Sequence, residues 1–494
     1  MIGLDVERVY VEVDITFGMK NFQVVGLPDR AVREAVGRVE SAIKTSGFAF
    51  PRYKITVNLA PASMKKAGPV YDVPIAIGIL LAQGLFAVEK PCLLVGELGL
   101  DGAIRHVDGI LPITIAAKAW GFPSIIVPAC NAKEAAVVEG IEVLGVAHIK
   151  ALVAHLDGSA PITPTPPTAM AVSVAPKAAS DMRYVKGQER AKRALEIAAA
   201  GAHNILLSGP PGSGKTMLAR ALPTILPQLT AREALDITRV HSVSGTLHGR
   251  SLMSDRPFQA PHHTTSGVAL IGGGAHPKPG QVSLAHRGVL FLDEFPEFSK
   301  QALENLRQPL EDGTVTVSRA AGTATFPAQF MLVAAMNPCP CGYASDPFHP
   351  CICTPSQIVR YQKKLSGPLI DRIDLHLEVP KIPVEQLADD NESEPSTTIQ
   401  SRVQAARDIQ TERFRGTDLV TNADMQAKDI KVYCVLEPDA RLMLATAAQT
   451  LHVSARAYIR ILKVARTIAD LSALPTLTAY CISEALQFRE RVCR

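Results

Sequence analysis

Two periodicities of apolar residues run through the first 157 positions. Tyr10–Ile15 and Lys54–Leu59 alternate apolar and polar side chains, which is typical of half-buried strands. Arg30–Thr45 and Val73–Gln83 repeat their apolar residues at helical spacing instead. This mixture predicts a first domain of the α+β or α/β class.

A parallel sheet is predicted for the middle of the chain. Three short apolar runs, Asn204–Leu207, Val289–Leu292 and Phe330–Ala334, each end in glycine, acidic or polar residues. Helical spacing fills the sequence between them, as in sheets whose parallel strands are joined by helices. From Ser401–Cys493 the spacing stays helical, which predicts an all-helical C-terminal part.

Two polar stretches divide the chain. Gly158–Ser180 is rich in Pro, Ala, Ser and Thr with almost no charge, a composition that stays extended. Ala388–Thr398 is acidic and polar, and we interpret it as a loop. A chain of 494 residues should hold several domains of about 150 residues each. We therefore predict a first domain at 1–157, a linker at 158–180, a middle domain at 181–387 and a helical domain at 388–494.

Composition narrows the class of protein. Hydrophobic residues make up 47% of the chain, enough to build folded cores, and the net charge of +4 neither requires nor excludes nucleic acid. The apolar run Val73–Ala82 is much shorter than the ~20 residues that cross a bilayer, and no signal peptide opens the sequence. Nine cysteines, four of them between Cys339 and Cys353, suit a reducing cytosol. We expect a cytoplasmic protein with no membrane partner.

A phosphate-binding loop is the clearest motif. Gly209–Thr216 reads GPPGSGKT between an apolar strand and a helix, as a P-loop does. Its glycines let backbone N–H groups face phosphate oxygens at a helix N-terminus. Lys215 is expected to reach the β- and γ-phosphates, and Thr216 to bind Mg²⁺, so ATP and Mg²⁺ are the predicted cofactors. The residues of this loop are Gly209, Pro210, Pro211, Gly212, Ser213, Gly214, Lys215 and Thr216.

Two more strand ends complete a hydrolytic pattern. The strand VLFLDE ends in two carboxylates, of which Asp293 is predicted to bind the metal and Glu294 to polarise the attacking water. The next strand ends at Asn337, whose amide is placed to orient the same water. Taken singly, these residues also fit ordinary strand ends. Their order after the P-loop favours the functional interpretation.

Six longer motifs extend the pattern over essentially the whole chain. Together with the three strands they resemble the ComM/YifB group of Mg-chelatase-like AAA+ ATPases. The resemblance implies an N-terminal Lon-protease-like (ribosomal S5 domain 2-like) α+β domain, an AAA+ P-loop core and a C-terminal helical lid. The motifs are RPFQAPHHTTSGVALIGGG, PGQVSLAHRGVLFLDEFPEF, LRQPLEDG, AAMNPCPCG, LSGPLIDRIDLHLEVP and SARAYIRILKVARTIADL.

The resemblance also implies a ring, as a homo-hexamer with ATP at the subunit interfaces. Arg372 matches the arginine finger that enters a neighbour's site, and Arg456 matches the sensor-2 arginine of the lid. Without the resemblance, each would be interpreted as a surface salt-bridge residue. Gly187 and Gln188 match the chain entry near the adenine. Three further basic residues at helical spacing fit a solvated face: Arg460, Lys463 and Arg466.

ComM-like proteins are regarded as helicases that drive DNA branch migration during natural transformation, so the resemblance implies a DNA motor. Pro261–Gly274 is polar and then glycine-rich, which predicts a pore loop carrying His262 and His263 as candidate DNA contacts. These adjacent histidines should point apart, so we expect no metal there. Thr314–Thr325 predicts a hairpin with Arg319 near its tip as a candidate phosphate contact, and an ordinary solvated arginine fits equally well.

Two other functions share parts of the pattern. A Mg-chelatase motor would use the same core, but the resemblance implies that such subunits lack this N-terminal domain. A Lon-type protease needs a serine activated by a lysine. The matching segments have no serine within Lys65–Ala76 and Pro112 in place of the lysine. The missing dyad disfavours proteolysis and leaves the N-terminal domain a structural or DNA-facing role.

A cysteine cluster follows Asn337. Cys339 and Cys341 are separated by nine residues from Cys351 and Cys353. Four thiolates at such spacing can close a tetrahedral, structural zinc site. Four reduced cysteines on a loop stay the alternative, because Cys-x-Cys pairs are tighter than the usual Cys-x₂-Cys. The remaining cysteines are interpreted as core or incidental: Cys92, Cys130, Cys434, Cys481 and Cys493.

Overall fold

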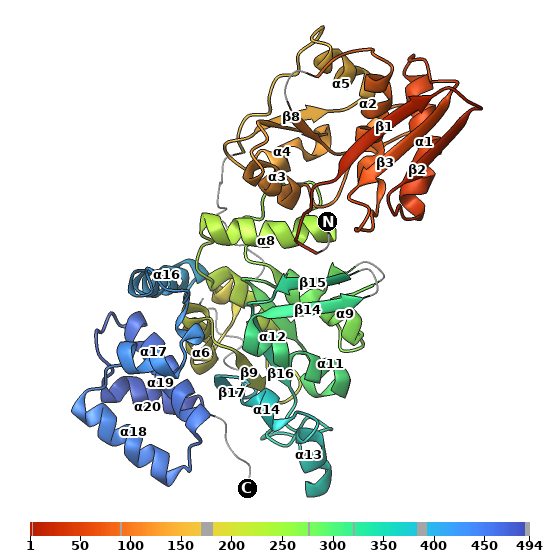
Figure 1. Cartoon of the computed structure of the whole chain (residues 1–494). Coiled ribbons are helices and arrows are strands. Elements are labelled where there is room, and N and C mark those ends of the chain that lie inside the picture. The colour runs from red at the N-terminus through yellow and green to blue at the C-terminus, as the bar shows by residue number, and fades with distance from the viewer. Residues whose placement is uncertain are drawn as a thin grey trace.

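The protein folds into three parts that follow one another along the chain (Figure 1). The computed structural model describes residues 1, 3–88, 91–168, 181–274, 277–319, 322–382 and 393–489. An N-terminal part lies at one end, a sheet-containing part with the P-loop lies in the middle, and a helical part packs beside the latter. Much of the predicted linker (169–180) and most of the acidic loop (383–392) lie outside the described residues.

Two small sheets build the N-terminal part. In the first, β3 (Lys54–Ala60) pairs antiparallel with β1 (Tyr10–Thr16) and parallel with β2 (Asn21–Val25). The second is parallel, in the order β4 (Cys92–Leu94), β7 (Ser124–Pro128) and β8 (Glu142–Val146). A short antiparallel pair and five helices complete it: β5 (Glu97–Leu98), β6 (Ile104–Arg105), α1 (Arg30–Thr45), α2 (Asp72–Ala82), α3 (Ile110–Ala119), α4 (Ala132–Ala135) and α5 (Ile149–Leu156).

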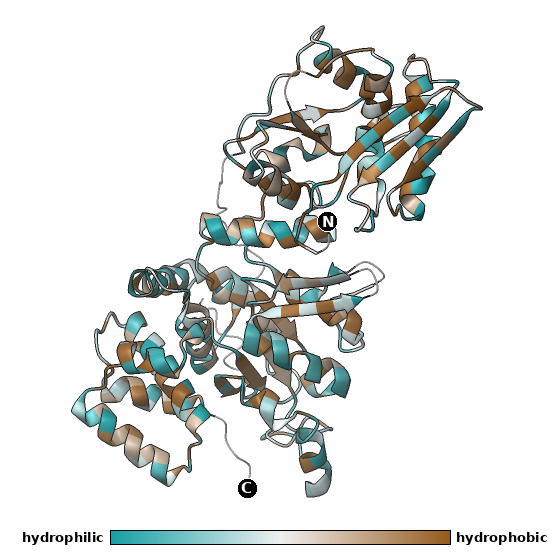
Figure 2. Ribbon diagram, in the orientation of Figure 1, coloured by the Kyte–Doolittle hydropathy of each residue, from teal (hydrophilic) through white to brown (hydrophobic). Residues whose placement is uncertain are grey.

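One-sided burial explains these elements. Figure 2 shows hydrophobic and hydrophilic residues alternating along the strands of the first sheet. Helix α1 buries Val32, Val39 and Ile43 on one face, and Asp29 caps it by accepting a hydrogen bond of 2.8 Å from the Val32 amide. The predicted strands and helices of this part are confirmed. The second sheet was not predicted, because its strands are short and carry no clear alternation.

The described part of the predicted linker packs against the N-terminal part. The Thr165 amide donates a hydrogen bond of 2.8 Å to the Val143 carbonyl, and the Thr168 amide donates one of 2.9 Å to the Ala136 carbonyl. These bonds tie the extended residues 161–168 to β8 and the turn after α4. The first folded unit therefore continues past residue 157 as far as Thr168.

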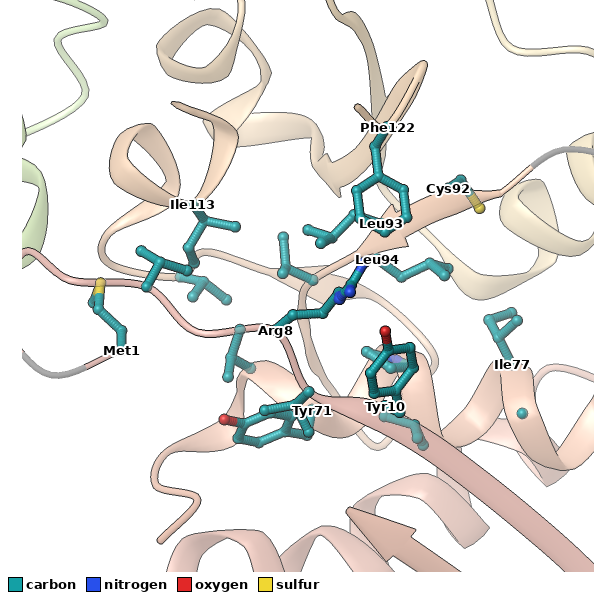
Figure 3. A pocket seen from close by; sticks show the side chains of 18 of the residues that line it. Met1, Arg8, Tyr10, Tyr71, Ile77, Cys92, Leu93, Leu94, Ile113 and Phe122 are labelled. Carbon is teal, nitrogen blue, oxygen red and sulfur yellow. The ribbon is translucent and has the colours of Figure 1, made fainter. Parts of the chain in front are cut away.

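An apolar groove of about 700 Å³ lies between β1 and β4. Figure 3 shows Arg8 reaching into it beside Tyr10. The guanidinium carbon of Arg8 lies 5.0 Å from the centre of the Tyr10 ring and 6.0 Å from that of Trp120, so aromatic faces hold the cation. Neither a serine nor a lysine is among the described residues that line the groove. The groove therefore offers no serine–lysine pair.

The middle part is built on a five-stranded parallel sheet in the order β10-β13-β16-β9-β17. The three predicted strands are confirmed as β9 (Ile205–Ser208), β13 (Val289–Leu292) and β16 (Met331–Met336) at its centre. The edge strands β10 (Phe258–Gln259) and β17 (Leu375–Glu378) were not predicted. Strand β10 has only two residues, and β17 lies inside a motif that is notable for its charged residues.

Helices cover both faces of this sheet, and α8 joins it to the N-terminal part (Figure 1). The Ser242 hydroxyl of α8 donates a hydrogen bond of 2.6 Å to the Glu134 carboxylate. The Gly109 amide donates one of 3.1 Å to the Ser242 carbonyl. The helices are α6 (Glu189–Gly201), α7 (Lys215–Ala221), α8 (Ala231–Ser244), α9 (Gly267–Ile271), α10 (Gln281–Leu284), α11 (Lys300–Asn305), α12 (Arg307–Asp312), α13 (Pro355–Gln362) and α14 (Gly367–Ile370).

The two predicted pore segments differ in how well they were anticipated. The hairpin is confirmed as β14 (Thr314–Arg319) paired antiparallel with β15 (Gly322–Pro327). The open loop predicted over Pro261–Gly274 was wrong for its second half, which forms α9 and β11 (Gly272–Gly273), with β11 paired to β12 (Lys278–Pro279). Ser266 caps α9 by accepting from the Ala269 amide, and Leu270 is fully buried, so a cap and an apolar anchor order this segment.

Five α-helices form the helical part, as predicted. They are α16 (Ser396–Arg413), α17 (Ala427–Tyr433), α18 (Pro438–Thr450), α19 (Ala455–Leu471) and α20 (Ala479–Gln487). Cys434 and Cys481 are buried in this part, in agreement with their interpretation as core residues. None of the helices in the described ranges is long and apolar enough to span a bilayer.

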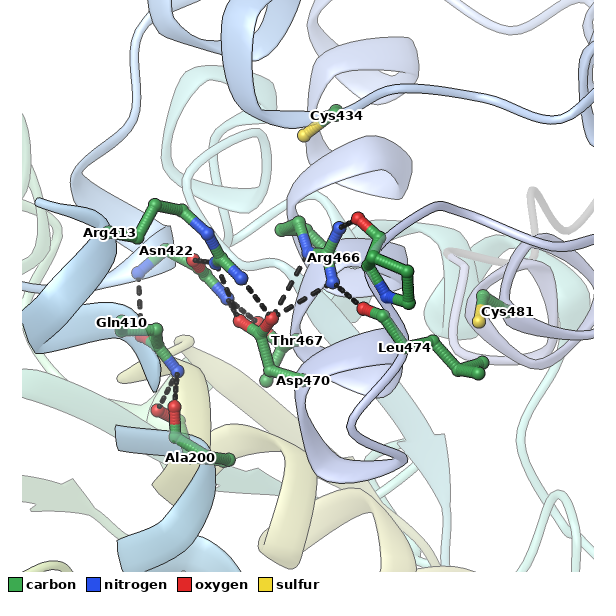
Figure 4. Close-up of polar contacts among 12 residues, drawn as sticks. Ala200, Gln410, Arg413, Asn422, Cys434, Arg466, Thr467, Asp470, Leu474 and Cys481 are labelled. Carbon is green, nitrogen blue, oxygen red and sulfur yellow. Dashed lines mark hydrogen bonds and ion pairs between the residues drawn. The ribbon is translucent and has the colours of Figure 1, made fainter. Parts of the chain in front are cut away.

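A buried ionic network around Asp470 joins α16 to α19 (Figure 4). The Asp470 carboxylate accepts hydrogen bonds from Asn422 at 2.8 Å, from Arg466 at 3.1 Å and from Arg413. Arg466 is only 1% exposed and also donates to the Pro475 carbonyl at 2.8 Å. The carboxylate and carbonyl acceptors match the fork of guanidinium donors, which makes burial of this charge tolerable.

The solvated face predicted for Arg460, Lys463 and Arg466 was therefore wrong for two of these residues. Arg460 is largely buried and donates to the Ile373 carbonyl at 2.6 Å, which fixes α19 against the residues before β17. Helical spacing of basic residues does not reveal carbonyl and carboxylate acceptors that come from elsewhere in the chain.

Replacing Asp470→Ala should destabilise the helical part by about 3–5 kcal/mol, because two arginines then lose their buried carboxylate. Hydrogen exchange measured by mass spectrometry on peptides from α16 and α19 reports this loss locally. Glu412→Ala is the matched control, since its ion pair with Arg415 is exposed and should contribute less than about 1 kcal/mol. Equal exchange in the two variants would contradict the importance of the network.

Candidate functional site

The predicted nucleotide-site residues meet at one edge of the central sheet. The P-loop follows β9, Asp293 follows β13 and Asn337 follows β16, and these three strands are parallel neighbours. Parallel strands end at the same edge, so the residues after them come together. The Thr216 hydroxyl donates a hydrogen bond of 2.8 Å to the Asp293 carboxylate, and Lys215 Nζ lies 3.4 Å from Asn337 Oδ1.

Glycines allow the course of the P-loop. Gly212 and Gly214 adopt φ angles of 76° and 92°, in the left-handed region that favours glycine. Gly209 is needed for a different reason, because a Cβ there would lie 2.2 Å from the Val379 carbonyl oxygen. The loop therefore turns tightly over the sheet and delivers its chain to the start of α7.

Lys215 is drawn into its own loop. Its ammonium donates to the carbonyls of Gly209 at 2.8 Å and Pro210 at 2.9 Å. Burial lowers the pKa of Lys215, and the Asp293 carboxylate acts in the opposite sense. Phosphate oxygens are stronger acceptors for an ammonium than neutral carbonyls. The side chain is thus placed to exchange its carbonyl partners for a bound phosphate.

Gln188 closes the other side of the P-loop. It has a φ of 58°, and Gly187 before it has a φ of 60°, so the chain turns sharply into α6. The Gln188 side-chain amide donates to the Pro380 carbonyl at 2.6 Å and to the Ser213 carbonyl at 3.3 Å. The pair predicted to lie near the adenine therefore does border the P-loop.

Glu294 contacts a histidine that was assigned elsewhere. His263 Nδ1 lies 2.9 Å from Glu294 Oε2, although His263 was predicted only as a DNA contact. The rings of His262 and His263 have centroids 4.1 Å apart, so the prediction that these side chains point apart was wrong. His263 follows β10, which lies beside β13 in the sheet. Only the order of strands in the sheet connects it with Glu294, and the sequence did not reveal β10.

Arg372 and Arg456 lie at the opposite edge of the sheet. A cavity of about 590 Å³ there is lined by both arginines and by residues that precede the strands: Asn204, Gly288, Phe330 and Asp374. Arg372 forms an ion pair with Glu311, and Arg456 lies 3.6 Å from Asp371 with 69% of its side chain exposed. The structure therefore brings these two arginines together, but away from the P-loop of their own chain.

The four clustered cysteines converge. The Sγ atoms of Cys339, Cys341, Cys351 and Cys353 all lie within 4.8 Å of one another, and this is the one such group found among the described residues. Three of the Sγ–Sγ distances are 3.3, 3.5 and 3.6 Å. Sulfurs at about 2.3 Å from a tetrahedral zinc are separated by roughly 3.8 Å, so the cluster has the dimensions of a metal site. A hydrogen bond from the Tyr343 amide lowers the pKa of Cys341 to about 6.

This cluster shares a wall with the nucleotide site. Its first cysteine comes two residues after Asn337. Gly342 packs so tightly that a Cβ there would lie 2.7 Å from Cγ of Pro211 in the P-loop. The loop that holds the cysteines therefore borders both Asn337 and the phosphate-binding residues.

Family models match three consecutive parts of the chain. They are described as subunit ChlI of Mg-chelatase for residues 11–131, magnesium chelatase subunit ChlI for 181–387, and its C-terminal part for 393–489. The protein YifB of Escherichia coli is 43% identical over 491 residues, which cover 99% of this chain and 95% of YifB. The competence protein ComM of Haemophilus influenzae is 42% identical over 496 residues, covering 99% of this chain and 96% of ComM. The chain belongs to the ComM/YifB family.

Membership in the ComM/YifB family gives this chain a Mg-chelatase-like AAA+ core, which suggests ATPase activity. The magnesium-chelatase 67 kDa subunit of Chlorobaculum parvum is 28% identical over only 158 residues, or 31% of this chain and 23% of that subunit. The family description for residues 11–131 also names a chelatase subunit, so the presence of the N-terminal domain does not by itself argue against a chelatase. The full-length similarity to ComM and YifB is the better discriminator.

Proposed function

We propose that this ComM/YifB-family protein is an ATP-hydrolysing, ring-forming motor that acts on DNA and promotes branch migration of recombination intermediates. The observation that carries the proposal is the convergence of Lys215, Thr216, Asp293 and Asn337 at one edge of the sheet. Glu294 adjoins them as the group to polarise water. A DNA substrate would place the protein in the cytoplasm.

The residues at this edge fit ATP and Mg²⁺. The P-loop amides and Lys215 would bind the phosphates, and Thr216 and Asp293 offer oxygen ligands of the kind that Mg²⁺ prefers. When bound, the metal supplies charge neutralisation on the transferred phosphoryl group. Asn337 would orient the attacking water, and Glu294 would accept its proton.

The two predicted pore segments support the DNA part of the proposal. A Cβ on Gly273 of β11 would lie 3.0 Å from an Arg319 guanidinium nitrogen, so the β11–β12 and β14–β15 hairpins lie side by side. Arg319 is exposed and forms no ion pair with any described residue, which leaves its charge available for a phosphate. His262 lies on the same segment, and its ring nitrogen contacts Thr264 at 2.9 Å.

The position of Arg372 and Arg456 supports the ring. Both lie across the sheet from the P-loop of their own chain, so they would serve a nucleotide only if a neighbour supplied it. A closed homo-hexamer would place this arginine-bearing edge against the next subunit's P-loop. Arginine there would stabilise charge on the transferred phosphoryl group.

A chelatase-type motor is the second candidate function, because all three family descriptions name a chelatase subunit. It would drive a partner protein that inserts Mg²⁺ into a porphyrin, and it would use the same nucleotide site. Metal-insertion assays with chelatase partner subunits separate the two functions. The DNA motor is preferred because the similarity to ComM spans the full chain.

The cysteine cluster adds a zinc cofactor to the proposal. Four convergent thiols fit a closed, structural Zn²⁺ site better than a catalytic one, which would keep an open coordination position. The ion would brace the loop that leads from Asn337 to the surface packed on Pro211. Zinc would then contribute to hydrolysis only by holding these residues in place.

DNA should stimulate ATP hydrolysis by the wild-type protein, and ATP should drive migration of a synthetic four-way junction. Glu294→Gln should still bind ATP but lose both activities, because the amide cannot take the proton from water. Steady-state ATPase assays with and without junction DNA, and gel analysis of junction products, check this. Failure of DNA to bind or to stimulate the wild-type protein in the presence of ATP would overturn the DNA part.

Two inactive variants should restore activity when their subunits are mixed. Lys215→Ala removes phosphate binding but keeps the arginine edge, whereas Arg372→Ala keeps the P-loop and should lose about 10³-fold in ATPase rate. A mixed ring contains interfaces with an intact P-loop from one chain and an intact arginine from the next. A mixture of Lys215→Ala with Glu294→Gln is the control, since both changes damage the same side of the interface. If the first mixture stays as inactive as its components, Arg372 does not act across subunits.

Purified protein should contain about one zinc ion per chain, measured by plasma mass spectrometry. The double change Cys351→Ser with Cys353→Ser should abolish zinc binding and speed hydrogen exchange in the segment around Asn337. Cys130→Ser is the control, because Cys130 is exposed and lies outside the cluster. Zinc-free wild-type protein prepared without chelators, or full zinc content in the double variant, would contradict the site.

A further inference from the structure

The ion pair between His263 and Glu294 has no role in the hydrolytic arrangement described above. His263 Nδ1 lies 2.9 Å from Glu294 Oε2, with 31% of the histidine and 55% of the glutamate side chain exposed. No described P-loop residue hydrogen-bonds to the Glu294 carboxylate. A carboxylate that accepts a charge-assisted hydrogen bond from a histidine is less able to accept one from water. The contact therefore competes with the use of Glu294 as a base.

We propose that His263 is a positioning residue that holds Glu294 away from the attacking water, and that DNA binding to the pore segments releases it. This inference rests on the proposed function and names how the same site would be regulated. Three features of the structure carry it: the register of the sheet, the ordered segment after His263, and the contact of that segment with Arg319.

Sheet register makes the contact a built-in feature of the fold. Strand β10 pairs parallel with β13, with Gln259 opposite Leu290. His263 and Glu294 each follow their register partner by four residues, so both reach the same edge at the same height. Glu294 also has a φ of 51°, which is unusual for a residue with a side chain. Its amide donates to Asp293 Oδ1 at 2.9 Å, which supports this turn.

The segment after His263 connects it to the candidate DNA-binding surface. Ser266, three residues later, caps α9, and the buried Leu270 anchors that helix. Helix α9 then leads into Gly272–Gly274, three glycines with φ angles of 115°, 157° and 99°. Such φ values suit glycine, so this turn can change its backbone conformation at low cost. Gly273 lies directly against the Arg319 side chain.

This chain of contacts supplies a mechanical route. A DNA strand that engages Arg319 would change the surroundings of Gly273, and α9 would shift with it. His263 lies at the start of that unit, so its hydrogen bond to Glu294 would lengthen or break. Glu294 would then be free to accept a proton from water. Without DNA the ion pair would keep basal hydrolysis low.

The test compares steady-state ATPase of the full chain with and without a single-stranded oligonucleotide. His263→Ala should raise the basal kcat about fivefold, the factor expected for loss of one hydrogen bond, while KM for ATP stays unchanged. The ratio of stimulated to basal rate should fall by the same factor. His263→Gln should keep the low basal rate, because its side-chain amide can still donate to the carboxylate.

His106→Ala is the matched control, since His106 forms a similar exposed pair with Asp108 at 3.2 Å in the N-terminal part. It should change neither rate. If His263→Ala does not fold, His263→Leu keeps much of the volume and also removes the N–H donor.

A basal kcat for the histidine variants equal to or below that of the wild type would overturn the inference. A wild-type protein that does not hydrolyse ATP would overturn the proposed function instead. A raised basal rate in a protein that DNA does not stimulate would support the restraint on Glu294 and exclude DNA as its release.

Discussion

Parallel pairing of β9, β13 and β16 is the constraint on which the rest of the structure depends. Because these strands end at one edge, residues up to 128 positions apart in sequence, Gly209 and Asn337, border a single site. The pairing also accounts for the Thr216–Asp293 hydrogen bond and the approach of Lys215 to Asn337. A shift of register by one residue would turn the following side chains to the other face. The packed, fully buried β13 and β16 make such a shift costly.

The same sheet has a second edge, and its chemistry complements the first. Anion-binding amides and Lys215 gather where the strands end, while Arg372 and Arg456 gather where the strands begin. One chain cannot bring both edges to the same phosphate, because the sheet lies between them. Repetition of the chain around a ring resolves this geometry with the side chains already present. The buried contacts of Arg460 with the residues before β17 would then transmit movement of the helical part to the arginine edge.

Local pattern was enough to predict the three central strands, the helices α1 and α2, the hairpin at Thr314–Thr325 and the P-loop. These elements have long or distinctive runs, and their form depends on nearby residues. Features that depend on distant partners were missed. Strand β10 has two residues, so the contact of His263 with Glu294 had no visible signal. Burial of Arg466 likewise depends on Asp470 and on the Pro475 carbonyl, which helical spacing alone does not reveal.

Each catalytic side chain at the nucleotide edge is held from a different element. Asn337 leads into the cysteine loop, which packs through Gly342 on Pro211, whereas Glu294 is held through His263 by the segment beside Arg319. The first support is compact and would be made rigid by a bound metal, because four ligands fix a loop that has little apolar core. The second ends in three glycines and an exposed hairpin, so it can yield. A site with one rigid and one yielding support can keep ATP bound while hydrolysis waits for a ligand at the hairpin.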